Sequence, residues 1–169
     1  QIRGTSTQMI AEKREGDKVG IIGPLGNAFT VPADDQKILA VAGGVGLGPI
    51  LFAAKEAQKQ GKDVSFITGF RNVKLVPSRD LFEGLDATIC TDDGSEGFSG
   101  NVVEYMKSLP AEQTDGALIW SCGPTPMLKA CHFYAEEIKI DCEVSMEELM
   151  ACGLGACMGC VCEVKTEAG

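Results

Sequence analysis

The chain has 169 residues, a formal net charge of -9 and 44% hydrophobic residues, which is enough apolar material for one hydrophobic core and a small annex. The acidic balance argues against nucleic acid as a partner, because an acidic surface repels phosphate backbones. The sequence has no apolar run long enough to span a bilayer and no basic-then-apolar leader, so neither membrane insertion nor a signal peptide is indicated.

Residues 1–32 begin with Gly4-Thr5-Ser6-Thr7 and continue, after a charged piece, into the apolar residues 19–22 between two glycine-containing turns. The short apolar run predicts a strand. A single strand cannot form a sheet, and the chain starts at Gln1 rather than at a methionine. We therefore expect residues 1–32 to be the tail of a β-domain that is truncated upstream.

From residue 37 the pattern changes to short apolar runs that alternate with segments of helical periodicity, which is typical of a parallel sheet covered by helices. The apolar runs predict strands at residues 37–42, 64–68, 87–90, 117–120 and 142–145. Predicted helices follow the first strand as far as Gly61, occupy residues 77–83, and cover the segments around Met106 and Cys131. The predicted fold of residues 33–142 is α/β, with a five-stranded parallel sheet and helices on both faces.

A glycine-rich turn, Gly43-Gly44-Val45-Gly46-Leu47-Gly48-Pro49, directly follows the first predicted strand and opens the first predicted helix. Backbone N–H groups at a helix N-terminus attract phosphate, so we expect a pyrophosphate here, with Pro49 at the first helical position, where no donor is lost. The spacing departs from the G-x-G-x-x-G fingerprint of Rossmann dehydrogenases, and a purely structural turn remains the alternative.

Three further polar turns follow later strands, at residues 69–72, residues 91–94 and Cys122-Gly123-Pro124. Ligands of open parallel sheets bind beyond the carboxyl ends of the strands. The four turns therefore predict one nucleotide site at that edge of the sheet.

The most specific motif lies at residues 148–162, where Cys152, Cys157 and Cys160 have the Cys-x4-Cys-x2-Cys spacing of a plant-type [2Fe-2S] cluster. The three glycines between them allow the chain to wrap closely around an inorganic core. A zinc knot and buried unligated thiols are the alternatives, although zinc sites usually pair their cysteines as two close doublets. The other cysteines fall in apparent strands and helices, which favours reduced thiols and a cytoplasmic location.

The cluster needs a fourth ligand. Cys162 follows Cys160 after one residue, so in an extended segment both side chains share one side and close a rhombic cluster poorly. Residues 161–166 look like a strand with nothing to turn it back. We therefore expect the fourth ligand beyond Gly169 and an incomplete cluster-binding region at residues 143–169.

These motifs, in this order, resemble the nucleotide domain of the ferredoxin-NADP reductase superfamily. The upstream Gly23-Pro24-Leu25-Gly26-Asn27-Ala28-Phe29 and the cysteine loop narrow the resemblance to the electron-transfer subunits of class B dihydroorotate dehydrogenases. The resemblance implies NAD on the parallel sheet, FAD between that sheet and an N-terminal barrel, and a [2Fe-2S] cluster connecting to an FMN-containing catalytic subunit in pyrimidine (UMP) biosynthesis. Residues 1–32 would be a remnant of the FAD-binding barrel.

The resemblance also implies roles for particular residues, with none assigned to catalysis. FAD would meet Gly4, Thr5 and Ser6, and Asp92 or Asp93 would accept from ribose hydroxyls. Cys122 would lie near the nicotinamide and the flavin. The alternative is that Cys122 serves only as a small apolar residue at the end of its strand. The remaining nucleotide-binding candidates are Gly43, Gly44, Gly46, Gly48, Pro49, Arg71, Gly123 and Pro124. His132 is expected to be solvated or structural.

Without the rest of the barrel, this chain is expected to retain FAD poorly. Without the fourth ligand, it is expected to lack the cluster as well. Two other functions remain open: a flavin reductase subunit of a ferredoxin-dependent transhydrogenase or sulfide dehydrogenase, and a nucleotide-binding regulator with a structural zinc knot. The choice between NAD and NADP also remains open.

Overall fold

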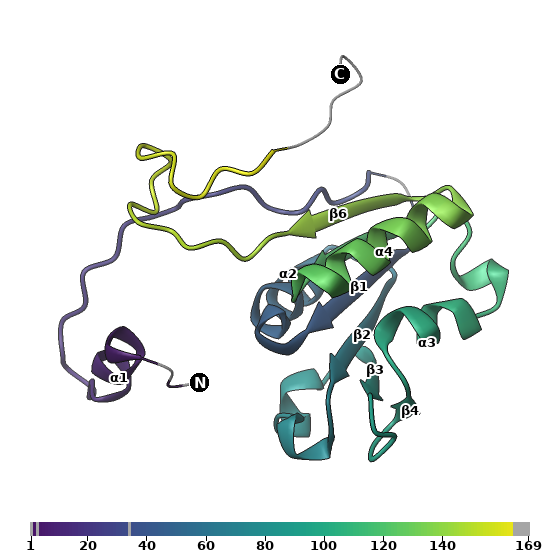
Figure 1. Cartoon of the computed structure of the whole chain (residues 1–169), viewed down its shortest axis with the longest axis horizontal. Coiled ribbons are helices and arrows are strands. Elements are labelled where there is room, and N and C mark those ends of the chain that lie inside the picture. Colours follow the sequence, from purple (N-terminus) through teal and green to yellow (C-terminus); the bar gives the residue numbers. More distant parts are fainter. Residues whose placement is uncertain (1, 3, 34, 164–169) are drawn as a thin grey trace.

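A computed structural model describes residues 2, 4–33 and 35–163. Its centre is a sheet of six parallel strands in the order β4-β3-β2-β1-β5-β6 (Figure 1). The strands are β1 (Ile38–Gly43), β2 (Val64–Phe70), β3 (Asp86–Thr91), β4 (Phe98–Ser99), β5 (Leu118–Cys122) and β6 (Asp141–Ser145). The five predicted strands are confirmed. The strand count was wrong by one, because β4 has two residues in a glycine-rich stretch and leaves no periodic pattern.

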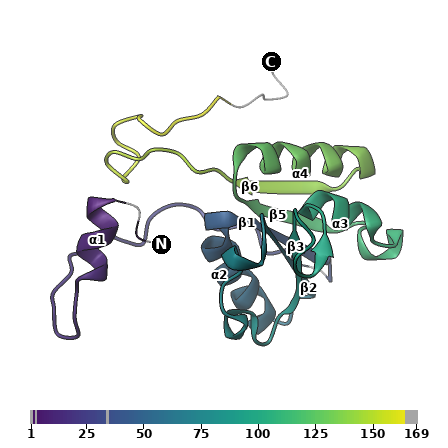
Figure 2. The ribbon, with the colours of Figure 1, turned by 60° about the horizontal axis from the view of Figure 1, so that its bottom comes forward.

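Helices cover both faces of the sheet, as predicted (Figure 2). Helix α2 (Leu47–Lys59) packs on one face, and helices α3 (Val102–Ser108) and α4 (Thr125–Ile138) pack on the other. The segment predicted as a helix at residues 77–83 forms a 3-10 turn at Arg79–Phe82. Further 3-10 turns lie at Gly44–Gly46, Val73–Leu75 and Ala111–Gln113.

Strand β1 shows why a continuous apolar run forms the middle of this sheet. All six of its residues are buried. Alternate side chains point to opposite faces of a strand, so Ile38, Ala40 and Ala42 join the core under α2, while Leu39 and Val41 join the core under α3 and α4. Both faces are therefore closed to water.

The predicted strand at residues 19–22 is wrong, because the structure has no strand there. Val19, Ile21 and Ile22 are exposed, and a strand without a pairing partner does not persist. Helix α1 (Thr5–Ala11) stands apart from the sheet (Figures 1 and 2). The assignment of residues 1–32 to a flavin-binding barrel stays a prediction.

The N-terminal segment meets the α/β core at Phe29. Its ring stacks on Trp120 of β5, with centroids 5.3 Å apart and an interplanar angle of 19°. The adjacent Thr30 N–H donates to a carboxylate oxygen of Glu143 in β6 at 2.8 Å. These two contacts fix the entry of the chain into the domain.

After β6 the described chain continues to residue 163 without a helix or strand. The predicted strand at residues 161–166 is therefore wrong over residues 161–163, and the rest of it lies outside the described residues. No helix of the described part is long and apolar enough to cross a membrane.

Candidate functional site

The principal cavity lies at the carboxyl edge of the sheet and has a volume of about 700 Å³. Residues that follow all six strands line it, because parallel strands in register end at a common edge. The lining consists of Gly43, Gly44, Val45, Gly69, Phe70, Arg71, Leu75, Asp92, Asn101, Val102, Pro124, Met127 and Glu147. Of the predicted nucleotide-binding residues, the structure brings Gly43, Gly44, Arg71, Asp92 and Pro124 together on this wall.

Close approach of neighbouring atoms, from backbone at Gly46 and Gly123 and from a side chain at Gly43, explains three glycines of the site. A Cβ on Gly46 would overlap the carbonyl oxygen of Cys122, and a Cβ on Gly43 would overlap the Met127 sulfur. A Cβ on Gly123 would lie 3.0 Å from the Gly43 carbonyl oxygen. These glycines let the turn after β1 and the turn after β5 touch, which closes one end of the cavity.

Gly44 and Gly48 have open space where a Cβ would be. Gly44 also has φ +55, in the left-handed region that favours glycine. Helix α2 begins at Leu47, so Pro49 is the third helical residue rather than the first as predicted. Its missing N–H still falls in the first turn, where N–H groups have no intrahelical partner.

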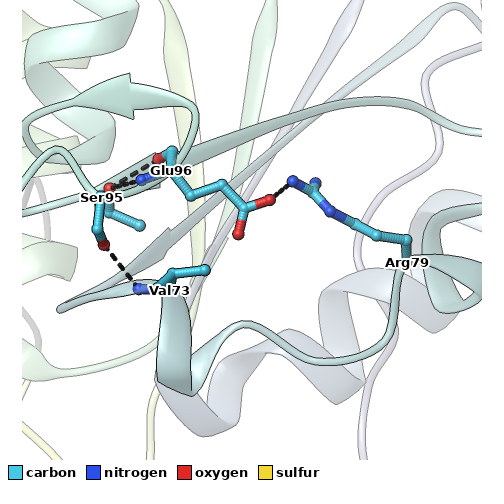
Figure 3. A network of polar contacts seen from close by, with 5 residues as sticks. Val73, Arg79, Ser95 and Glu96 are labelled. Carbon is cyan, nitrogen blue, oxygen red and sulfur yellow. Dashed lines mark hydrogen bonds and ion pairs between the residues drawn. The ribbon is translucent and has the colours of Figure 1, made fainter.

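The structure distinguishes between the two aspartates after β3. Asp92 lines the cavity. Asp93 Oδ1 instead accepts from the Ser95 N–H at 3.0 Å and from the Ser95 hydroxyl at 2.5 Å. These two hydrogen bonds lower the pKa of the Asp93 carboxyl, which belongs to the polar network shown in part in Figure 3.

Two polar wall residues were missed from the sequence. Asn101 caps α3 by accepting from the N–H groups of Val103 and Glu104, each at 3.0 Å; an Asn before a helix with Glu at its third position is a readable capping signal. Glu147 comes from the segment after β6 and carried no signal of its own. With Arg71 and Asp92, it gives the wall one cation and two carboxylates.

Cys122 ends β5 and is buried beneath the glycine turn. Burial raises the pKa of its thiol; a hydrogen bond with Ser145 opposes this and the charge of Glu147 adds to it. A raised pKa keeps the Cys122 thiol neutral, which agrees with the alternative that Cys122 serves as a small apolar residue at the end of β5. Cys122 itself is not on the cavity wall.

The cysteine loop carries donors that favour a thiolate. The Leu154 N–H donates to Cys152 Sγ at 3.3 Å. That hydrogen bond, with others from the N–H and thiol of Cys157 and the N–H of Ala156, lowers the pKa of the Cys152 thiol to about 6. Gly153 and Gly155, with φ +67 and +76, provide the bends that the sequence predicted.

The three predicted cluster ligands are only partly assembled. Cys152 and Cys157 are in hydrogen-bonding contact, whereas no three His, Cys, Asp or Glu side chains of the described residues are grouped closely enough to hold a metal ion. The thiol donor set and the convergent amides fit an iron-sulfur cluster at Cys152 and Cys157. The position of Cys160 does not complete that set here.

The remaining predicted residues lie away from the cavity. Gly4, Thr5 and Ser6 are exposed at the start of α1, where the Gly4 N–H donates to the Thr7 hydroxyl at 3.0 Å. They form no part of the cavity wall, and their contact with FAD stays a prediction. His132 is exposed on α4 beside Glu136, at 3.5 Å, as expected for a solvated histidine.

A family model described as the iron-sulfur cluster binding domain of dihydroorotate dehydrogenase B matches residues 147–169. A dihydroorotate dehydrogenase B (NAD(+)), electron transfer subunit, from Caldanaerobacter subterraneus subsp. tengcongensis is 36% identical over 170 residues, covering 100% of this chain and 66% of the relative. A probable subunit of the same name from Methanocaldococcus jannaschii is 42% identical over 158 residues, covering 93% of this chain and 60% of the relative.

Among solved structures, an NADH-dependent reduced ferredoxin-NADP oxidoreductase, described in the context of flavin-based electron bifurcation, superimposes with a TM-score of 0.76 at 30% identity. The match covers 95% of this chain and 58% of that one, and it confirms the ferredoxin-reductase-type fold. The chain spans 66% and 60% of the length of the two curated relatives. By its similarity along nearly its whole length, the chain belongs to the family of electron transfer subunits of dihydroorotate dehydrogenase B.

Proposed function

We propose that the chain is the part of an electron transfer subunit that takes electrons from or gives them to NAD(H) and relays them, through FAD and a [2Fe-2S] cluster, to a dihydroorotate dehydrogenase catalytic subunit. One observation carries the proposal. Glu147 lies on the wall of the nucleotide-sized cavity, and the loop with Cys152, Cys157 and Cys160 begins five residues later in the same chain. Nucleotide site and cluster loop are therefore joined by a short tether.

The cavity suits a dinucleotide. Its volume of about 700 Å³ lies within the usual range of small-molecule sites, about 300–1,000 Å³. The open backbone at Gly44 and Gly48 and the first turn of α2 supply N–H groups for the pyrophosphate. Asp92 supplies a carboxylate for ribose hydroxyls, and Arg71 supplies a positive charge for phosphate.

The relay needs three redox groups because nicotinamide exchanges two electrons as a hydride, whereas an iron-sulfur cluster exchanges one at a time, and a flavin mediates between them. This chain's own contribution is to hold the nicotinamide nucleotide at the sheet edge and to present thiolates to the cluster. The N–H groups around Cys152 stabilise the negative charge that sulfur ligands carry.

The FMN-containing catalytic subunit is the proposed partner, and the substrate chemistry on dihydroorotate belongs to that partner. The exposed apolar side chains Met146, Leu149, Met150 and Leu154 lie at the cysteine loop, where electrons would leave the chain. A cytoplasmic location is proposed as well, since all eight cysteines are free thiols.

The test is anaerobic reconstitution of the full-length protein, which would include the fourth ligand expected beyond Gly169, with iron and sulfide, followed by NADH titration and by electron paramagnetic resonance after dithionite. We expect NADH binding, bound iron and sulfide without zinc, and the signal of a reduced [2Fe-2S] cluster. Zinc without iron would support the nucleotide-binding regulator with a structural knot instead.

A second candidate function is that of a reductase subunit that serves ferredoxin. It is favoured by the solved NADH-dependent reduced ferredoxin-NADP oxidoreductase, whose fold matches 95% of this chain. The two functions differ in partner. Steady-state turnover with dihydroorotate dehydrogenase catalytic subunit and with ferredoxin, each from the native host, distinguishes them.

A further inference from the structure

We propose that four residues outside the cavity wall, Asp93, Ser95, Glu96 and Arg79, form a polar clip that holds the segment after β2 in place and thereby sets the affinity for the nucleotide. The inference rests on the proposed nucleotide site. It concerns positioning residues, since none of the four lines the cavity.

The first half of the clip is a directed chain of hydrogen bonds. The Ser95 hydroxyl donates its one proton to Asp93 Oδ1 at 2.5 Å, which leaves its oxygen to accept from the Val73 N–H at 2.8 Å. The Ser95 N–H also donates to Asp93 Oδ1. Asp93 therefore orients the hydroxyl that accepts from the Val73 N–H. Figure 3 shows the hydrogen bond between Ser95 and Val73.

The second half is an ion pair between Arg79 and Glu96 (Figure 3). The backbone of Glu96 is itself anchored to the sheet, because its N–H donates to the Thr91 hydroxyl at 3.0 Å and its carbonyl accepts from the same hydroxyl at 2.7 Å. Thr91 is fully buried at the end of β3. Arg79 is thus tied to a fixed point of the core.

The tethered segment depends on these contacts because few of its side chains are buried. Val73 and Leu75 are 44% and 53% exposed. The next firmly buried side chain is Phe82, which packs against Phe66 with ring centroids 5.8 Å apart. A segment with so little apolar burial opens at low cost, and Leu75, which it carries, is part of the cavity wall.

If the segment opens, the fraction of molecules with a complete wall falls, and the apparent nucleotide affinity falls with it. Cys122, which is expected near the nicotinamide, lies at the end of β5, and the clip spans the β2 and β3 side of the sheet. Weakening the clip is therefore expected to change nucleotide affinity and leave the hydride-transfer rate at saturation unaltered.

The experiment titrates NADH into the full chain and follows energy transfer from Trp120, the single tryptophan of the sequence, which lies in β5 three residues before Gly123. Ser95→Ala, Arg79→Gln and Glu96→Gln are each expected to weaken binding roughly three- to tenfold, the range of one hydrogen bond or one partly exposed ion pair. Ser95→Thr and the charge swap Arg79→Glu with Glu96→Arg are expected to restore it.

The matched control is the ion pair of Lys107 with Glu137, 2.8 Å apart on α3 and α4, where Lys107→Gln is expected to leave NADH binding unchanged. Amide hydrogen exchange over residues 73–79 gives a second readout, with faster exchange expected in Ser95→Ala and Glu96→Gln. Unchanged affinity and unchanged exchange in these variants would overturn the clip. An unaltered chain that binds no NADH would overturn the proposed nucleotide site itself.

Discussion

Gly46 packs against Cys122 so closely that a Cβ on the glycine would overlap the carbonyl oxygen of the cysteine. The contact joins the turn after β1 to the end of β5, two segments more than seventy residues apart in the chain. It requires Gly46 for packing, whereas Gly48, two residues later, faces open space.

The two glycines therefore predict opposite effects of alanine. Gly46→Ala is expected to lower the free energy of unfolding by about 1–3 kcal/mol, because backbone must move to accept the methyl group. Gly48→Ala lies inside α2 and is expected to raise it by up to about 1 kcal/mol through helix propensity. Urea denaturation measures both, and NADH titration of Gly48→Ala reports whether the open face meets the ligand. Equal stabilities of the two variants would contradict the packing role of Gly46.

The fold was predictable wherever burial requires a continuous or periodic pattern of apolar residues in the sequence. The boundaries of β1 were predicted to within one residue because both its faces are buried and the run is continuous. Residues 19–22 carry a similar apolar pattern, but the described chain provides no strand beside them. Pattern alone does not tell a paired strand from an unpaired one.

Only those site residues were predictable that directly follow a parallel strand, because parallel strands end at one edge of the sheet. Topology placed Gly44, Arg71 and Asp92 there, since each follows a parallel strand. Glu147 and the ion pair of Arg79 with Glu96 depend on how loops fold over that edge. Such contacts join residues with no periodic relation, so the sequence carried no signal for them.

Asn101 has two roles that substitution separates. Asn101→Ala removes the side-chain cap of α3 and is expected to cost about 1 kcal/mol of stability. Asn101→Asp keeps a capping oxygen, so its stability is expected to match the unaltered chain. It also adds a negative charge to a wall that already carries Asp92 and Glu147, which is expected to weaken NADH binding about fivefold. Thermal unfolding and NADH titration check the two effects independently.

Phe29 is expected to hold the N-terminal segment on the sheet. Phe29→Ala removes the ring stacked on Trp120 and is expected to cost roughly 1–2 kcal/mol, because Phe29 is only partly buried. Trp120 is then more exposed, so its fluorescence maximum should shift to the red. Phe52→Ala is the control, since Phe52 is 71% exposed on α2. An unshifted Trp120 spectrum in Phe29→Ala would contradict the stacking.

Asp93 predicts a pH dependence of stability. Its pKa in the folded chain is lowered from the ordinary value of 3.8 by hydrogen bonds from Ser95. A carboxyl with a lowered folded pKa stabilises the fold above its unfolded pKa, and this contribution disappears as the pH falls through the folded value. The unaltered chain is therefore expected to exceed Asp93→Asn in urea midpoint near neutral pH, and the difference should shrink below pH 3.8. A difference that is constant with pH would show that the charge of Asp93 is not involved.

The cysteine loop predicts which thiols hold the cluster. Cys152→Ser, Cys157→Ser and Cys160→Ser are each expected to lose bound iron and sulfide and the resonance signal of the reduced cluster, because each removes one thiolate of the Cys-x4-Cys-x2-Cys set. Cys162→Ser is the matched control, because Cys162 lies two residues after Cys160 in the same loop, and this variant is expected to keep the iron, the sulfide and the signal. Iron and sulfide analysis with electron paramagnetic resonance measures all four variants. Loss of the cluster in Cys162→Ser, with retention in Cys160→Ser, would move the third ligand from Cys160 to Cys162.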